Sequence, residues 1–338
     1  MLVIDGSQGE GGGQVLRTAL ALSLVTRRPF AMERIRAGRA RPGLMRQHLT
    51  AVRAAAEIGA AEVSGAELGT QQLRFAPTTV ATGDHRFAVG SAGSALLVLQ
   101  TVLPALLTAG AASRLVVEGG THNPLSPPFD FIDRTYLPLV RRMGPEVAAT
   151  LDRPGFYPAG GGRVSVAVDP APALRPLTLL ERGPIRARRV RAIVANLPLH
   201  IAESEARQAV RELSWPDDAA VAETVDADGP GNALLVDVES EGLTEVFSAF
   251  GERRRAVREV VADAVGQVRR YLAADVPVGP HLADQLVLLL ALAGGGRFRT
   301  EPPTLHLTTN VAVIGRFLEV PIGLSPLPDA RGVEVCVG

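Results

Sequence analysis

Residues 5–17, DGSQGEGGGQVLR, connect a short apolar segment at residues 1–4 to an amphipathic helix expected over about 14–27. The glycines let the backbone approach an anion closely, and the free amide groups of a helix N-terminus favour such a ligand. Glu10 stands among these glycines, so a phosphate site here needs a divalent cation that bridges the carboxylate and the phosphate. A plain strand-to-helix turn with a solvated Glu10 is the alternative. Arg17 follows on the first turns of the helix.

The composition is that of a globular protein: the 338 residues are 46% hydrophobic, and this length predicts about two domains. The formal net charge is zero, so any contact with nucleic acid must come from a local patch. We expect a cytoplasmic protein with no membrane partner, because the chain lacks a signal-like N-terminus and an apolar run of the ~20 residues that span a bilayer. The single cysteine, Cys336, excludes an intrachain disulfide and a multi-cysteine metal site.

All 35 basic residues are arginines. The absence of lysine excludes a Walker lysine, a Schiff-base lysine and a lysyl nucleophile, which leaves histidine as the natural nitrogen nucleophile. The histidines do not have the spacing of a zinc site, and we expect two of them, His85 and His200, at the surface. The six are His48, His85, His122, His200, His281 and His306.

A succession of helix, strand, polar loop, helix and hairpin occurs three times. The first unit opens near Gln14 and the second near Gly93, whereas the third opens near His281, far later than the first spacing predicts. Residues 179–278 fill the difference with a strand, a helix, two strands and a long helix, which predicts a small α/β domain inserted between the second and third units. The expected divisions are therefore 1–178 for the first two units, 179–278 for the insert and 279–338 for the third unit.

The first two candidate loci are rich in arginine. One is Glu10 with Arg17. The other is the loop RAGRARPGLMRQH, residues 36–48, which ends in Gln47 and His48 and supplies several guanidinium groups that suit bidentate phosphate binding. A solvated basic loop is the alternative. Its arginines are Arg36, Arg39, Arg41 and Arg46.

The other two candidate loci are polar residues in apolar surroundings. Gln100 lies in one apolar helix, and Asp284 with Gln285 lies in another; a buried amide or carboxylate needs partners, although a helix cap would also satisfy Asp284. His306 lies in TLHLTTN, which alternates as a strand does and predicts that its ring faces away from Leu305 and Leu307. A buried histidine of the core is the alternative there.

Six motifs in one order resemble the RNA 3′-terminal phosphate cyclase family over essentially the whole chain. They are DGSQGEGGGQVLR, IRAGRARPGLMRQHL, GGTHNPLSPP, GFYPAGGGRV, HLADQLVLLLALA and TLHLTTN. The resemblance implies an α/β (α+β) fold of three βα units like those in the C-terminal domain of translation initiation factor three. It also implies a smaller inserted domain of thioredoxin-like topology, in agreement with the repeat and the insert found above.

The resemblance implies an ATP-dependent reaction that converts an RNA 3′-phosphate to a 2′,3′-cyclic phosphate through enzyme-AMP and RNA-adenylate intermediates, and releases AMP and pyrophosphate. His306 corresponds to the nucleophile and Glu10 to the ligand of Mg²⁺ or Mn²⁺. The matching ATP contacts are Gln100, His281, Leu282, Ala283, Asp284 and Gln285, with Pro127 and Phe131 in an adenine pocket. The matching contacts to phosphate and the RNA end are Arg17, Arg36, Arg39, Gln47 and His48.

The chain departs from the family at two positions. Relatives tend to have an aromatic residue where His281 stands, which bears on base stacking, and a basic residue where Pro154 stands, which does not touch the chemistry. The partners implied are ATP and the single-stranded 3′ end of an RNA, and the oligomeric state stays open, with a homodimer as one option.

Two alternative functions stay open. One is a non-cyclising ribosome-assembly relative of the same fold, a branch that lacks the histidine found here at His306. The other is a carboxyvinyl transferase built from related units, which we would expect to use lysines.

Overall fold

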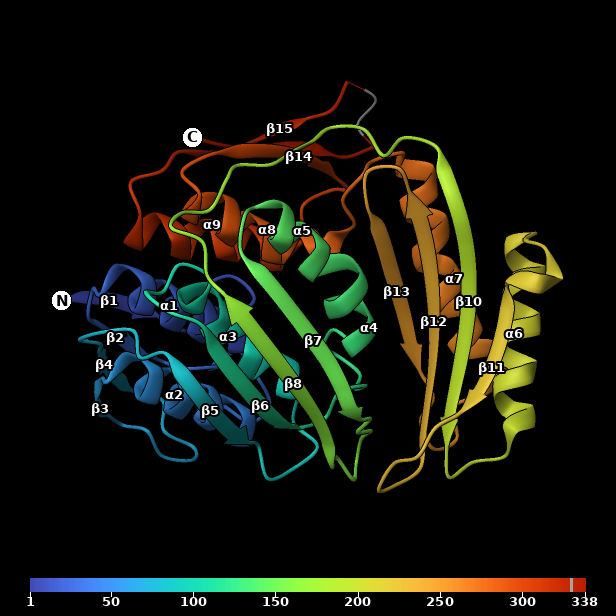
Figure 1. The fold of residues 1–338 in the computed structure, drawn as a ribbon, viewed down its shortest axis with the longest axis horizontal. Helices are drawn as coiled ribbons and strands as arrows, with labels where there is room; N and C mark the ends of the chain where they lie inside the picture. Colours follow the sequence, from blue (N-terminus) through green and yellow to red (C-terminus); the bar gives the residue numbers. More distant parts are fainter. Residues whose placement is uncertain (329–330) are drawn as a thin grey trace.

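The computed structural model describes residues 1–328 and 331–338, and shows a mixed α/β protein. Within these residues the strands form four four-stranded sheets, each with parallel and antiparallel neighbours. Figure 1 shows three of the sheets around a central group of helices, with the fourth sheet and its two long helices beside them on the right. No helix among the described residues is long and apolar enough to cross a membrane.

The first sheet has the order β1-β2-β4-β3. β1 and β2 run parallel across α1, while β4 runs antiparallel to β2 and β3. The element bounds are β1 Leu2–Asp5, α1 Gly13–Thr26, β2 Phe30–Glu33, α2 Arg46–Gly59, β3 Glu62–Ser64 and β4 Leu73–Ala76. In this order α1, β2, α2 and the pair β3–β4 correspond to the helix, strand, helix and hairpin expected of the first unit.

The second sheet repeats this topology as β5-β6-β8-β7, with β5 parallel to β6 and β8 antiparallel to both of its neighbours. The bounds are β5 Gly83–Ala88, α3 Ala95–Leu106, β6 Ser113–Gly119, α4 Phe129–Phe131, the π-helical turn η1 Ile132–Tyr136, α5 Leu137–Arg142, β7 Glu146–Arg153 and β8 Gly162–Asp169. The predicted helix over 129–143 is thus confirmed, as a helix with one widened turn. β5 was not predicted.

The third sheet also has this topology, in the order β9-β14-β16-β15. β9 is parallel to β14, and β16 is antiparallel to β14 and β15. The bounds are β9 Thr178–Leu179, α8 Pro280–Leu292, β14 Gly296–Thr300, α9 Leu305–Phe317, β15 Ile322–Pro326 and β16 Val333–Val337. The predicted final hairpin corresponds to β15 and β16, and its residues 329–330 lie outside the described part of the chain.

The inserted segment leaves the third sheet from the middle of a strand. Leu179 of β9 lies beside Phe298 of β14, and the chain returns at Val278, which bridges in parallel to Thr300 of the same strand. Residues 180–277 therefore lie between β9 and the strand segment at Val278 in the sequence, and both ends of this stretch lie beside β14. The expected divisions at 178/179 and 278/279 stay a prediction.

The inserted segment has a sheet of its own, ordered β11-β10-β12-β13. The bounds are β10 Ile185–Ala195, α6 Leu199–Leu213, the 3₁₀ turn η2 Asp217–Ala219, β11 Ala220–Thr224, β12 Gly231–Ser240, β13 Thr244–Phe250 and α7 Val257–Ala274. The sequence predicts two strands between the helices, and the structure has three. β13 is missed because Glu245 and Ser248 break its apolar pattern, although Glu245 is buried.

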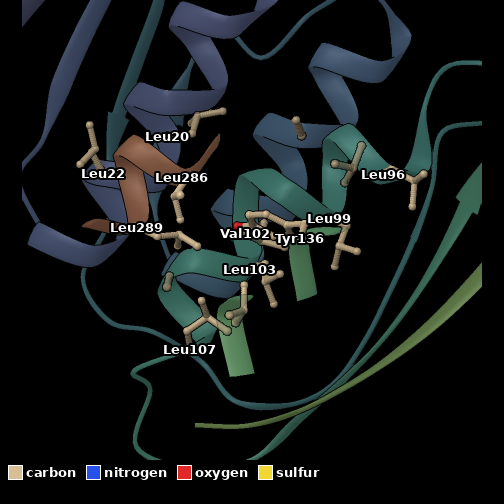
Figure 2. Close-up of a cluster of buried hydrophobic side chains, with 14 of the residues drawn as sticks. Leu20, Leu22, Leu96, Leu99, Val102, Leu103, Leu107, Tyr136, Leu286 and Leu289 are labelled. Carbon is tan, nitrogen blue, oxygen red and sulfur yellow. The ribbon is translucent and has the colours of Figure 1, made fainter. Parts of the chain in front are cut away.

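The helices of the three units share one hydrophobic core (Figure 2). Leu20 of α1, Leu99 and Leu103 of α3 and Leu286 of α8 are all buried there, together with Tyr136 of η1. α3 carries no charged side chain, which is typical of a helix buried on all sides. A second cluster packs α6 and α7 on the inserted sheet.

The prediction of a strand over TLHLTTN is wrong. Residues 305–310 form the first turns of α9, and the neighbouring strand β14 ends earlier, at Thr300. Thr304 is the N-cap residue: its hydroxyl accepts a hydrogen bond from the amide of Leu307 at 2.9 Å. Such a cap satisfies an otherwise free amide of the first turn and so favours a helix over the strand that the alternation indicates.

Leu103→Ala should lower the free energy of unfolding by about 2–5 kcal/mol, because it leaves a cavity among helices of different units. Leu103 has no exposed surface, whereas Leu68, 57% exposed, provides a matched control. Leu68→Ala should change stability by less than ~0.5 kcal/mol. Urea denaturation of both variants measures the difference, and equal effects would contradict the placement of Leu103 in the core.

Candidate active site

Glu10 joins the glycine-rich turn of the first unit to the third unit. Its Oε1 atom accepts a hydrogen bond from the Gln14 amide at 2.9 Å, which caps the start of α1. Its own amide donates to the hydroxyl of Thr309 on α9 at 3.0 Å. Its Oε2 atom forms an ion pair with Arg39, and only 4% of the side chain is exposed. The predicted carboxylate is therefore held rigidly where α1 and α9 begin.

Three arginines gather around this one carboxylate. Burial lowers the pKa of Arg17 to about 10, and the charges of Arg36 and Arg39 lower it further while Glu10 opposes them. Burial and then Arg39 likewise lower the pKa of Arg36, again against Glu10. Mutual repulsion of this kind shows an excess of positive charge, which a bound anion would relieve. The arginine loop and the glycine-rich turn therefore meet in one cluster of positive charge, and anion binding there stays a prediction.

His48 adds a neutral donor to this cluster. Its Nδ1 atom accepts a hydrogen bond from the Met45 amide at 3.3 Å, so the ring proton resides on Nε2. Burial, followed by the charges of Arg17 and Arg36, lowers the pKa of His48 to about 3. A side chain added at Gly13 would collide with Nε2, which places that atom beside the start of α1. His48 therefore presents an uncharged N–H group next to the arginines.

The N-terminal turns of α8 and α9 are joined by polar side chains. The Thr304 hydroxyl donates to the Asp284 carboxylate, and the Asn310 amide nitrogen donates to the Asp284 carbonyl. The Asn310 Oδ1 atom accepts from Thr18 of α1 at 2.7 Å and from Gln14 at 3.1 Å. Burial raises the pKa of Asp284 to about 7, although the Thr304 hydrogen bond opposes this shift. These hydrogen bonds thus hold the N-terminal parts of α1, α8 and α9 together.

His306 lies in this junction as the second residue of α9, half-buried. Burial lowers its pKa, and so do the charges of Arg17 and Arg39, whereas Glu10 raises it. The ring is therefore neutral at neutral pH and keeps a lone pair for nucleophilic attack. His281, in the first turn of α8, is close enough for protonation of His306 to lower its pKa, in addition to the effect of desolvation.

A pocket opens between α1, α3, α8 and α9. Gln100 and Gln285, predicted from different units, meet at its wall through a side-chain hydrogen bond. Arg17 joins it to the cluster of positive charge. The polar residues that line the pocket are Gln14, Arg17, Thr18, Gln100, Tyr136, Asp284, Gln285 and Asn310.

Five of the predicted site residues do not present a side chain to this pocket. Leu282, Ala283 and Phe131 are buried in the core, so their side chains are not offered to this pocket. The Gln47 Oε1 atom accepts a hydrogen bond from the Ser94 amide at 3.0 Å, at the start of α3. Pro127 lies partly exposed in the loop before α4.

Sequence reasoning missed Gln14, Thr18, Thr309 and Asn310. A signal was available for the last two, because Thr309 and Asn310 are polar residues directly before the apolar run of α9. One histidine prediction is also wrong: His85 is buried on β5, with its Nδ1 atom 2.9 Å from Glu57. His200 is exposed, as predicted.

The described residues contain no group of three or more His, Cys, Asp or Glu side chains that could hold a metal ion. Glu10 is one carboxylate, and one or two carboxylates with phosphate oxygens are the usual protein ligands of Mg²⁺ in nucleotide sites. The cluster therefore fits a cation that arrives with a nucleotide, and does not fit one that the protein binds by itself.

Comparison with known proteins identifies the family of this chain. A family model described as RNA 3′-terminal phosphate cyclase matches residues 8–324. The chain is 51% identical over 326 residues to the RNA 3′-terminal phosphate cyclase of Koribacter versatilis, covering 96% of this chain and 92% of that protein. It is 52% identical over 336 residues to the RNA 3′-terminal phosphate cyclase of Salmonella agona, and the match covers 99% of this chain and 97% of that protein. The chain belongs to the RNA 3′-terminal phosphate cyclase family.

His48 should make the protein less stable in acid. Its pKa is about 3 in the fold, whereas an unfolded histidine titrates near 6.5. Between these values the unfolded chain binds the extra proton, so the free energy of unfolding falls as the pH falls, by at most about 1.4 kcal/mol per pH unit. His48→Gln should flatten this slope in denaturation series from pH 7 to pH 4. His200→Gln, at an exposed site, is the control, and an unchanged slope in His48→Gln would contradict a neutral, buried His48.

Proposed function

We propose that this protein converts the 3′-terminal phosphate of an RNA to a 2′,3′-cyclic phosphate, with consumption of ATP and release of AMP and pyrophosphate. The observation that carries the proposal is His306, a neutral imidazole at the junction of three helix ends, beside Glu10 and three arginines. Family membership supports the reaction class. This reaction needs a nitrogen nucleophile and cationic groups that bind phosphate, and we assign these roles to His306 and to the arginines.

In the first step the imidazole of His306 attacks the α-phosphorus of ATP. A nitrogen–phosphorus bond forms, and pyrophosphate leaves with the electrons of the broken bond. Arg17 and Arg39 lie where they neutralise the charge that develops on the phosphoryl oxygens, an effect that is strong in a partly buried site. The lowered pKa of His306 keeps the attacking nitrogen unprotonated.

In the second step an oxygen of the RNA 3′-phosphate attacks the adenylyl phosphorus and releases His306. Arg36 and the Nε2–H group of His48 are suited to hold this phosphate, and the Gln47 amide nitrogen is its further contact. In the third step the 2′-hydroxyl attacks the phosphorus of the 3′-phosphate, loses its proton and expels AMP. Binding contributes mainly by holding the hydroxyl in line, and DNA, which lacks it, cannot complete this step.

We assign the nucleotide to the mouth of the pocket between α3 and α8, because the cavity itself, about 30 Å³, is too small to enclose it. Gln100, Asp284 and Gln285 offer polar contacts there, and Leu282 and Ala283 contribute through backbone rather than side chain, because their side chains are buried. His281 at the start of α8 is the proposed contact to the base, whereas Pro127 and Phe131 do not line this pocket. Mg²⁺ or Mn²⁺, held by Glu10 and the ATP phosphates, would supply additional neutralisation of charge.

We also propose how the chain divides. Three units of the kind found in the C-terminal domain of translation initiation factor three form one catalytic domain, made of residues 1–178 and 279–338. A thioredoxin-like domain, residues 179–278, is inserted in it. The shared strand order of three sheets and the separate core of the insert support this division. Because β9 pairs with β14, Leu179 would belong to the third unit under this proposal.

Labelling with α-³²P-ATP separates this function from its alternatives. The cyclase should retain an acid-labile, alkali-stable AMP label, whereas a ribosome-assembly relative and a carboxyvinyl transferase should not. His306, which the assembly branch lacks, favours the cyclase.

His306→Ala should abolish both the AMP adduct and cyclisation, because no other group replaces the nucleophile. His281→Ala should weaken ATP binding and still form adduct. Proteolysis and mapping of the labelled peptide measure this directly. AMP found on the peptide that contains His281, together with labelling of His306→Ala, would overturn the assignment.

Glu10→Gln should weaken the metal dependence of adduct formation and leave the fold intact, because the amide keeps an oxygen for the Gln14 hydrogen bond but loses the charge. Titration of adduct yield with Mg²⁺ measures the change. Asp5→Asn is the matched control, since Asp5 is also paired with an arginine, Arg34, nearer the surface. Equal metal dependence in Glu10→Gln and the parent would remove Glu10 from the metal site.

A further inference from the structure

Glu245 is a buried carboxyl that the proposed mechanism does not use. It lies on β13 of the inserted sheet with 2% of its surface exposed. Its Oε1 atom accepts a hydrogen bond of 2.6 Å from the amide of Gly279, the N-cap residue of α8. The inserted segment therefore touches the first residue of the helix that we assign to the nucleotide.

The contact at Gly279 is close and specific. A Cβ atom added there would lie 3.0 Å from both Cδ and Oε1 of Glu245, so the carboxyl fits against a glycine. No side chain of α8 caps its own N-terminus, and Pro280, the next residue, has no amide hydrogen to donate. Glu245 thus supplies from another sheet an acceptor that this helix end lacks.

The first turn of α8 is where the nucleotide pocket begins. Asp284 and Gln285 line that pocket, and His281 lies next to His306 in electrostatic range. Asp284 and Gln285 lie in the second turn of α8, whose backbone amides bond to carbonyls of the first turn, so a shift of Gly279 would displace all three side chains. We infer that Glu245 is a positioning residue, which fixes the start of α8 so that its side chains meet the nucleotide. This inference rests on the proposed function.

The surroundings of Glu245 favour its neutral form. Burial raises its pKa to about 8, the Gly279 hydrogen bond opposes this, and Glu301 raises it further. The other groups near it are Tyr271, whose hydroxyl donates to the Pro277 carbonyl at 2.9 Å, Arg182 over the Tyr271 ring, and Arg270 near Glu301. A neutral amide of the same shape should therefore replace the carboxyl, because it keeps the oxygen that Gly279 needs.

The test compares Glu245→Ala, Glu245→Gln and Glu205→Ala in the full chain. Glu205 is the matched control: it is 1% exposed in the same inserted segment and bonded to Asn232 at 2.7 Å, but on α6. The measurements are KM for ATP in adduct formation, the rate at saturating ATP, and Tm. Glu245→Ala should raise KM on the order of tenfold, as loss of one positioning hydrogen bond allows. Glu245→Gln should keep the parental KM, and Glu205→Ala should lower Tm with KM unchanged.

Three outcomes would overturn the inference: an unchanged KM in Glu245→Ala, an equal rise in Glu205→Ala, or a Glu245→Gln variant as impaired as Glu245→Ala. If Glu245→Ala does not fold, Glu245→Asp replaces it, since the shorter side chain withdraws the carboxyl from Gly279. Failure of the proposed function can be distinguished from failure of this inference, because the parent protein itself would then form no AMP adduct.

Discussion

The arrangement of the site depends on the buried amide of Asn310. It is 1% exposed, and its oxygen and nitrogen bond α1 and α8 at the same time. A buried amide that loses a partner costs about 1–3 kcal/mol, so the crossing of the three helices is fixed to the geometry that satisfies it. Because α1, α8 and α9 all begin near this crossing, Glu10, Asp284 and His306 are brought together from distant parts of the sequence.

The crossing of α1, α8 and α9 also determines how close the charged groups of the site lie to one another. Arg17 is fixed on α1 and Arg39 comes from the loop before α2, and Glu10 alone among the site's neighbouring groups offsets them at short range. The mutual repulsion of these arginines costs free energy, which a bound anion would lower. Burial, assisted by the neighbouring arginines, lowers the pKa of both His48 and His306 and so favours their neutral rings.

Much of the fold and several residues of the candidate site could be predicted from the sequence. The predictions that were wrong have physical reasons. Glycines before apolar helices identified the units, and residue chemistry identified Glu10, Arg17, Arg36 and His48. TLHLTTN alternates as a strand does, and the Thr304 cap that makes it a helix acts through a single hydrogen bond. Gln14 and Thr18 were missed for another reason. A polar residue on a helix is ordinarily solvated, and only the packing of another helix against it shows otherwise.

The interrupted strand of the third unit has a consequence for how this chain can be rearranged. Leu179 and Val278 lie opposite Phe298 and Thr300, so one residue joining them would restore a continuous strand beside β14. The inserted segment thus leaves and re-enters the sheet at nearly the same point, as a module acquired whole would. Its removal would leave the backbone beside β14 closed, and it would remove the contact of Glu245 with α8 together with the ion pairs that join Arg134 to Asp237 and Asp130 to Arg191.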